Sequence, residues 1–269
     1  MSITLIIHYC GDSREGRRQE YEECLRRNLA NGHIQRIINL GLDEVELPAF
    51  AQGNPKVISH AINHRMTFRD AFEFANRHLQ GQFVGIANLD TFLDDRDSDW
   101  PMAENLVRER NLVLCQSRIE FENDEKKYLD PAFSRLAFAN AQDAWFFVPP
   151  VPVENIDFEI GTLGCDNALA DRLKKAGKIP VNMGSRFKVF HYDLFRGKTG
   201  QNTNLVHRKE SEARGTVYSR FPEREGCYLT PDFDSVQSVD EIIKALQVDP
   251  IRRYQIISDL FSEKIRIIN

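Results

Sequence analysis

The stretch Phe83-Val84-Gly85-Ile86-Ala87-Asn88-Leu89-Asp90 joins an apolar segment to a polar end. Residues 83–87 have the length and composition of a buried β-strand, and the chain runs from them directly into Asn88 and Asp90. In open α/β sheets, ligands bind beyond the carboxyl ends of the strands. A carboxylate there can hold a hard divalent cation, which prefers oxygen ligands. The alternative is a solvated acidic turn, since Asp94 and Asp95 follow shortly after.

Strands and helices alternate upstream of this stretch. Residues 3–8 and 34–40 have the composition of strands, and residues 14–30 carry apolar or small residues at helical spacing. The pattern predicts another helix over 67–79, where Thr67 and Asp70 have the form of an N-terminal capping box. Strand, helix, strand is the opening of an α/β fold with a mostly parallel sheet.

The downstream sequence continues the same pattern. Strands are predicted over 112–115, 144–148 and 189–191, and a helix is predicted from Cys165 to near Gly177. Residues 195–220 are polar, which indicates a mobile loop, and Ser238-Val239-Asp240-Glu241 has the form of a capping box that opens a C-terminal helical segment. We therefore expect a single Rossmann-like domain, in which helices flank a mostly parallel central sheet and a C-terminal helical segment follows.

Composition excludes several classes of protein. The 269 residues carry a formal net charge of −5, which gives no basic footprint for nucleic acid. No apolar run approaches the roughly 20 residues of a membrane-spanning helix, and the N-terminus lacks the pattern of a signal peptide. The five cysteines are widely spaced and form no Cys-x-x-Cys pair, which favours reduced thiols. We expect a cytoplasmic protein.

Asp166 and His191 are further candidates for chemistry. Asp166, in Gly164-Cys165-Asp166-Asn167, lies near a predicted helix start, so it is either the N-cap or a general base that points into a cleft. His191 follows an apolar strand, where a single histidine is either a structural residue or a metal ligand.

Other motifs fail at defined positions. His60 and His64 have a spacing that would place both on one face of a helix, but Ala61 stands where a zinc protease needs glutamate. No phosphate-binding P-loop and no nucleophile elbow occurs in the chain. The first strand is followed by His8-Tyr9-Cys10-Gly11-Asp12 rather than by a glycine-rich dinucleotide turn.

The order of these segments resembles a GT-A-type glycosyltransferase, an enzyme that uses a nucleotide sugar and carries an Asp-x-Asp motif. The resemblance covers roughly residues 1–195. It is carried by Arg65-x-Thr67-Phe68-x-Asp70-x-Phe72-x-x-Ala75-Asn76, Ile86-Ala87-Asn88-x-Asp90, Gln142-Asp143-x-Trp145, Gly164-Cys165-Asp166-Asn167 and His191.

The resemblance implies roles for individual residues. Asn88 and Asp90 stand for the Asp-x-Asp motif, Asp166 for the catalytic acidic position and His191 for a late metal ligand. A Mn²⁺ or Mg²⁺ cofactor would be held by Asp90 and His191. The chain departs from the usual pattern at Asn88, where aspartate is expected, and at Asp193, where a second histidine is usual. The residues implied in nucleotide-sugar binding are His8, Tyr9, Arg65, Asn88, Leu89 and Asp90.

These roles imply a metal-assisted transfer of a sugar from a nucleotide sugar to the hydroxyl of a glycan or another acceptor. Asp166 would deprotonate the acceptor in a single displacement, which inverts the anomeric centre. Residues 1–195 would form the nucleotide-sugar-binding and catalytic domain, and residues 196–269 would be a mobile loop and C-terminal helical extension of it. The alternatives are a non-catalytic nucleotide- or glycan-binding protein of the same fold and a glycoside hydrolase, which needs a second acid facing Asp166.

Overall fold

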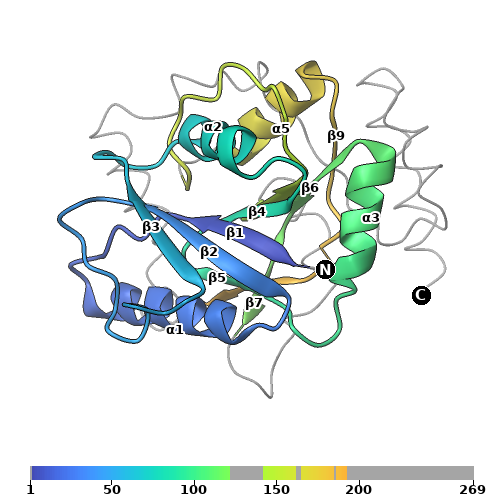
Figure 1. Cartoon of the computed structure of the whole chain (residues 1–269). Helices are drawn as coiled ribbons and strands as arrows, with labels where there is room; N and C mark the ends of the chain where they lie inside the picture. Colours follow the sequence, from blue (N-terminus) through green and yellow to red (C-terminus); the bar gives the residue numbers. More distant parts are fainter. Residues whose placement is uncertain (1, 122–141, 162–164, 185, 193–269) are drawn as a thin grey trace, which may run out of the picture.

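A seven-stranded sheet forms the centre of the computed structural model, which describes residues 2–121, 142–161, 165–184 and 186–192 (Figure 1). The strand order is β3-β2-β1-β4-β8-β6-β9. All pairings are parallel except those of β8, which is antiparallel to both of its neighbours. The strands are β1 (Ile3–Ile7), β2 (Ile34–Gly41), β3 (Val57–Ala61), β4 (Phe83–Ala87), β6 (Leu112–Gln116), β8 (Ala144–Phe147) and β9 (Ile179–Val181).

Helices cover both faces of this sheet. Alternate residues of β1 point to opposite faces: Ile3 and Leu5 pack with α1 and α3, whereas Ile6 packs with α2 and α5. Figure 1 shows α1 and α2 on opposite sides of the sheet. The predicted α/β fold with a mostly parallel central sheet flanked by helices is therefore confirmed. The helices are α1 (Glu15–Ala30), α2 (Phe68–His78), α3 (Trp100–Arg110) and α5 (Cys165–Lys175).

The chain reverses its direction of winding between β1 and β4. From β1 it proceeds through α1 to β2 and β3 on one side, and it then returns through α2 to β4 on the other side of β1. The strand order therefore reverses at β1, with β2 and β3 on one side of it and β4 on the other. In open α/β sheets such a switch point is where ligands bind.

The N-terminus of α2 has the predicted capping box. The Thr67 hydroxyl accepts a hydrogen bond from the Asp70 N–H at 3.2 Å, and Asp70 Oδ2 accepts one from the Thr67 N–H at 2.8 Å. The apolar stripe of this helix, which includes Phe68 and Phe72, is buried against β4 and β8. The capping box therefore fixes the N-terminus of α2, and Arg65 lies two residues before the cap.

A second sheet of three strands carries His191 to the end of β4. Its order is β5-β10-β7, with β5 over Thr91–Leu93, β7 over Arg118–Phe121 and β10 over Val189–Tyr192. The antiparallel pairing of β10 with β5 sets His191 opposite Thr91. The Tyr192 N–H donates to the Asp90 carbonyl at 3.0 Å, so the start of β5 and the end of β10 are joined at Asp90.

Several predictions concern residues outside the described part of the chain. These are the polar loop over 195–220, the capping box at 238–241, the C-terminal helical segment and the departure at Asp193. None of the helices in the described ranges has the length and apolar character that crossing a bilayer requires. The elements that sequence patterns did not predict are β3, β5, α3, β7 and β9.

Candidate active site at the ends of β1 and β4

Asp90 lies in a buried cluster of charged side chains just beyond β4. Its Oδ2 accepts a hydrogen bond from Arg17 Nη2 at 2.7 Å, and His191 Nε2 lies 3.3 Å from the same oxygen. Arg17 comes from the first turn of α1 and His191 from β10. The structure thus brings together Asp90 and His191, the two residues that the resemblance implies as metal ligands, and adds Arg17, which sequence reasoning did not single out.

The charge of Asp90 is stabilised by these neighbours. Burial alone raises the pKa of the Asp90 carboxyl, but His191 and Arg17 outweigh this effect and hold the pKa well below its usual range. Arg17 is itself only 3% exposed, and its second nitrogen, Nη1, donates to Glu20 Oε2 at 2.6 Å. Burial lowers the pKa of Arg17, yet Asp90 and Glu20 are among the groups that raise it above its ordinary value. The folded protein therefore holds Asp90 and Arg17 in their charged forms.

Asn88 connects the end of β4 to β8 through a second group of polar side chains. Its Nδ2 donates to Asp143 Oδ1 at 2.6 Å, and its backbone N–H donates to the Asp143 carbonyl at 2.9 Å. Arg118 Nη1 lies 3.1 Å from both carboxylate oxygens of Asp143. An aspartate at position 88 would meet the buried Asp143 carboxylate, so this contact gives a physical reason for the asparagine at the first position of the motif.

Asp166 lies one residue inside α5, in its first turn. Its Oδ2 accepts a hydrogen bond from the backbone N–H of Gln142 at 3.1 Å, which ties α5 to the residue just before Asp143. Burial, and then the nearby negative charge of Asp166, raise the pKa of the Cys115 thiol on β6. Asp166 is partly exposed. The backbone of Gln142, just before β8, thus positions the carboxylate at the same edge of the sheet as Asn88.

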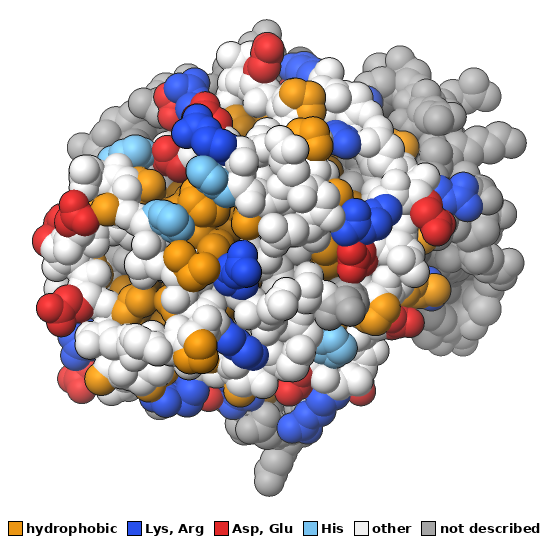
Figure 2. Space-filling model, in the orientation of Figure 1, with side chains coloured by type: hydrophobic (Ala, Val, Ile, Leu, Met, Phe, Trp, Pro, Cys, Tyr) orange, Lys and Arg blue, Asp and Glu red, His pale blue; other side chains and the backbone are white. Residues whose placement is uncertain are grey.

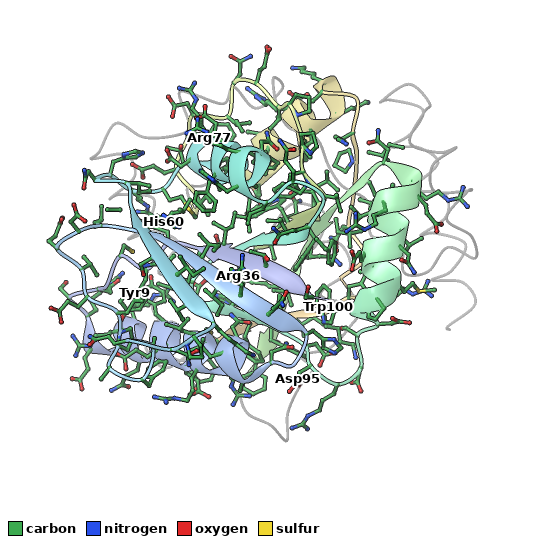
Figure 3. All side chains as sticks on the ribbon, in the orientation of Figure 1. Tyr9, Arg36, His60, Arg77, Asp95 and Trp100 are labelled. Carbon is green, nitrogen blue, oxygen red and sulfur yellow. The ribbon has the colours of Figure 1, made fainter. Side chains whose placement is uncertain are left out.

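His8 and Tyr9 follow β1 and face the strands beside it. His8 Nδ1 donates to the Leu40 carbonyl at 2.5 Å, which fixes the Nδ1–H tautomer of the neutral ring. The Tyr9 N–H donates to Asn39 Oδ1 at 2.9 Å. In Figure 3, Tyr9 and His60 lie toward one end of the sheet, whereas Trp100 at the start of α3 lies toward the other.

Arg65 lies close to the end of β1. Burial lowers the pKa of His8, and the nearby positive charge of Arg65 adds to this effect. Arg65 Nη2 donates to the Ile160 carbonyl at 3.3 Å, and Nε lies 3.5 Å from Glu159 Oε2. The Arg65 side chain is 42% exposed, so its positively charged guanidinium is accessible to solvent. Leu89, by contrast, is partly buried and packs against the core.

The structure separates the histidine pair that sequence spacing placed on one helix. His60 lies on β3, whereas His64 precedes α2 and its Nε2 lies 2.9 Å from Asp70 Oδ2. The arrangement of both rings on one helix face, which the spacing would allow, is therefore absent from the structure. The His60 ring contacts Phe74, which in turn contacts His78, at centroid distances of 4.9 and 4.8 Å. Figure 2 shows histidine and hydrophobic side chains gathered on this side of the molecule, around β3 and α2.

The described side chains do not fit a divalent cation at Asp90. No group of three or more His, Cys, Asp or Glu residues able to hold a metal ion occurs within the described ranges. Asp90 and His191 contact each other, and the guanidinium of Arg17 lies against the oxygen that a metal would share. The Mn²⁺ or Mg²⁺ cofactor stays a prediction, for which the described part of the chain does not supply a set of ligands.

Sequence reasoning did not identify Arg17, Arg118 or Asp143 as site residues. Asp143 belongs to the Gln142-Asp143-x-Trp145 motif, but nothing in the sequence indicates that it contacts Asn88. Arg17 belongs to a helix rich in arginine and glutamate, where most such side chains are solvated. A charged residue on the buried face of a helix was the only available signal.

Comparisons with known proteins give little further information. No family model matches the sequence, and no curated protein matches it. Among solved structures, the chain is similar to the mannosyltransferase PcManGT from Pyrobaculum calidifontis, whose structure is a complex with GDP-Man and Mn²⁺. The TM-score is 0.47 at 12% sequence identity, and the match covers 98% of this chain and 75% of that chain. A similarity at this level does not indicate an activity, so the function is argued from the site.

Proposed function

We propose that this protein is a glycosyltransferase that moves a sugar from a nucleotide sugar to an acceptor hydroxyl. The observation that carries the proposal is the position of Asn88 and Asp90 just beyond β4, with Asp166 at the same edge of the sheet, next to the switch point between β1 and β4. A crevice at a switch point suits a nucleotide, and a carboxylate beside it suits acid–base chemistry on a bound substrate.

The nucleotide part of the donor is assigned to the end of β1. His8 and Tyr9 come from the loop after β1, and the positive charge of Arg65, two residues before the N-cap of α2, acts on His8. A guanidinium forms charge-assisted hydrogen bonds with phosphate oxygens, which are stronger than neutral ones. Arg65 is therefore the candidate for binding the diphosphate, with Asn88, Leu89 and Asp90 lining the adjoining edge.

Asp166 is the candidate general base. In a single displacement, the Asp166 carboxylate takes the proton of the acceptor hydroxyl. At the same time the hydroxyl oxygen of the acceptor attacks the anomeric carbon, and the nucleoside diphosphate leaves. The hydrogen bond from the Gln142 N–H to Oδ2 orients the carboxylate. This step predicts inversion at the anomeric carbon.

The hydrolase alternative has less support. A glycoside hydrolase needs a protonated carboxylic acid opposite the second carboxylate. Asp143 lies on the same edge as Asp166, but its carboxylate already accepts hydrogen bonds from Arg118 and Asn88. A non-catalytic binding protein of the same fold would use the same crevice, so only turnover distinguishes it from a transferase.

A thermal-shift screen tests the proposal. The full chain is heated with UDP-, GDP-, dTDP- and CMP-sugars, with Mn²⁺ or with EDTA, and each stabilising donor is then assayed for release of its nucleotide in the presence of candidate acceptors. Stabilisation by a donor together with acceptor-dependent release supports a transferase. Binding without release supports the non-catalytic alternative, and stabilisation by glycans alone contradicts nucleotide-sugar binding.

A further inference from the structure

One guanidinium separates two buried carboxylates beside the end of β4. Arg17 Nη1 lies 2.6 Å from Glu20 Oε2, and Arg17 Nη2 lies 2.7 Å from Asp90 Oδ2. His191 Nε2 reaches the same Asp90 oxygen at 3.3 Å. Each of these four side chains is buried. Asp90 is the most exposed of them, and only 12% of its side-chain surface is accessible to solvent. The position between Glu20 and Asp90 is thus filled by a positive group of the chain itself.

The two carboxylates require a cation at this position. A buried carboxylate is costly unless it is paired, and two of them close together repel each other. Two carboxylate oxygens and an imidazole nitrogen are also ligands that Mn²⁺ accepts. An arginine guanidinium differs from a metal because it is covalently fixed and does not lose its proton in proteins. A divalent cation would have to enter against this fixed positive charge.

We propose that Arg17 occupies the position of a divalent cation at Asp90, so that the chain binds its donor without a metal ion. The part about the donor rests on the proposed glycosyltransferase function, whereas the part about Arg17 does not. Asp90 is then a positioning residue: it holds α1 and β10 against the end of β4, where Asn88 and Leu89 border the donor crevice. The positive charge for a diphosphate comes from side chains such as Arg65.

Mn²⁺ alone is the probe for this inference. The full chain is titrated with Mn²⁺ without nucleotide, and the free ion is counted by electron paramagnetic resonance, for the wild type and for Asp90→Asn. We expect no difference between the two proteins in sites tighter than about 1 mM, the range of weak protein cation sites. A tighter site in the wild type that Asp90→Asn abolishes would overturn the inference.

Arg17→Gln removes the cation and leaves Glu20, Asp90 and His191 in place. We expect the folded variant to gain a Mn²⁺ site and to be stabilised by Mn²⁺ against heat, whereas Arg18→Gln, a change at an exposed position of α1, gains neither. A folded Arg17→Gln protein that binds no Mn²⁺ contradicts the inference. If this variant does not fold, the wild-type titration decides. These titrations contain no nucleotide. A failure of the glycosyltransferase proposal, in which no nucleotide sugar stabilises the protein in the screen, is therefore a separate result.

Discussion

The side-chain amide of Asn88 donates a hydrogen bond to the carboxylate of Asp143, 55 residues later in the chain, at 2.6 Å. The contact joins the end of β4 to the start of β8. It explains why the first position of an Asp-x-Asp-like motif carries an amide here: the partner across the sheet edge is already an aspartate, which Arg118 also contacts.

Asn88→Asp should therefore destabilise the protein at neutral pH. The hydrogen bond becomes a repulsion between two carboxylates, and leaving a buried polar group unsatisfied typically costs about 1–3 kcal/mol. The pair would have one pKa raised in the folded state, so the loss of stability should be largest above that pKa and should shrink as the pH falls towards about 5. Urea unfolding at two pH values measures this, with Asn88→Ala as the control without an added charge. A pH-independent loss in both variants would contradict the account of the contact.

Asp166→Asn should give a folded protein that binds its donor and transfers the sugar far more slowly. The amide oxygen can still accept the Gln142 N–H, but an amide cannot act as a general base, and loss of such a base costs about 10²–10⁴-fold in rate. The matched control is Asp171→Asn on the same helix, where the carboxylate contacts Lys175 instead. Initial rates of nucleotide release provide the comparison. Turnover within a factor of a few of the wild type would remove Asp166 from the mechanism.

Arg65→Gln should weaken donor binding without lowering the melting temperature. Hydrogen bonds to charged groups contribute about 1.5–3 kcal/mol, so affinity should fall roughly 10- to 100-fold. Arg69→Gln is the control, because Arg69 is similarly exposed and pairs with Asp157. Calorimetry with the donor found by screening compares the two variants. Equal weakening in both would show a general effect of charge rather than a contact made by Arg65.

Thr67→Ala should lower the stability of the fold through the N-terminus of α2. The hydroxyl that accepts the Asp70 N–H is lost, and removal of such a cap typically costs about 1 kcal/mol. Thr67→Ser keeps the hydroxyl, so it should retain most of the stability that Thr67→Ala loses. Urea unfolding monitored by circular dichroism measures the difference. If serine and alanine destabilise equally, packing of the threonine methyl group, rather than the cap, is responsible.

Sequence patterns predicted the elements that are either fully buried or strongly amphipathic. β1 and β4 are short, largely apolar runs that are buried throughout, and α2 combines a capping box with an apolar stripe, so the local signals agree with the fold. The strand β3 was not predicted because it lies at the edge of the sheet, where Ser59 and His60 are exposed and the alternation of apolar residues is lost. The antiparallel direction of β8 has no local signature, since only its neighbours define it.

The candidate site was predictable only where its residues follow strands. Asn88 and Asp90 occupy such a position, and the strand that carries His191 was also predicted. The contacts of these residues were not predictable, because Arg17 and Asp143 lie far away in the sequence and meet them only through the packing of α1 and β8. The ion pair of Arg17 with Asp90 is the observation behind our proposal that a guanidinium takes the place of a metal ion at this motif.

Hydrogen–deuterium exchange with and without saturating nucleotide sugar tests the proposed site most directly. The donor is the one that stabilises the full chain in the screen, and exchange is followed by mass spectrometry. We expect protection in the peptides that contain residues 8–12, 62–66 and 88–91, the three segments to which we assign donor binding. Protection confined to other segments, or no protection with any stabilising donor, would contradict the placement of donor binding at this edge of the sheet.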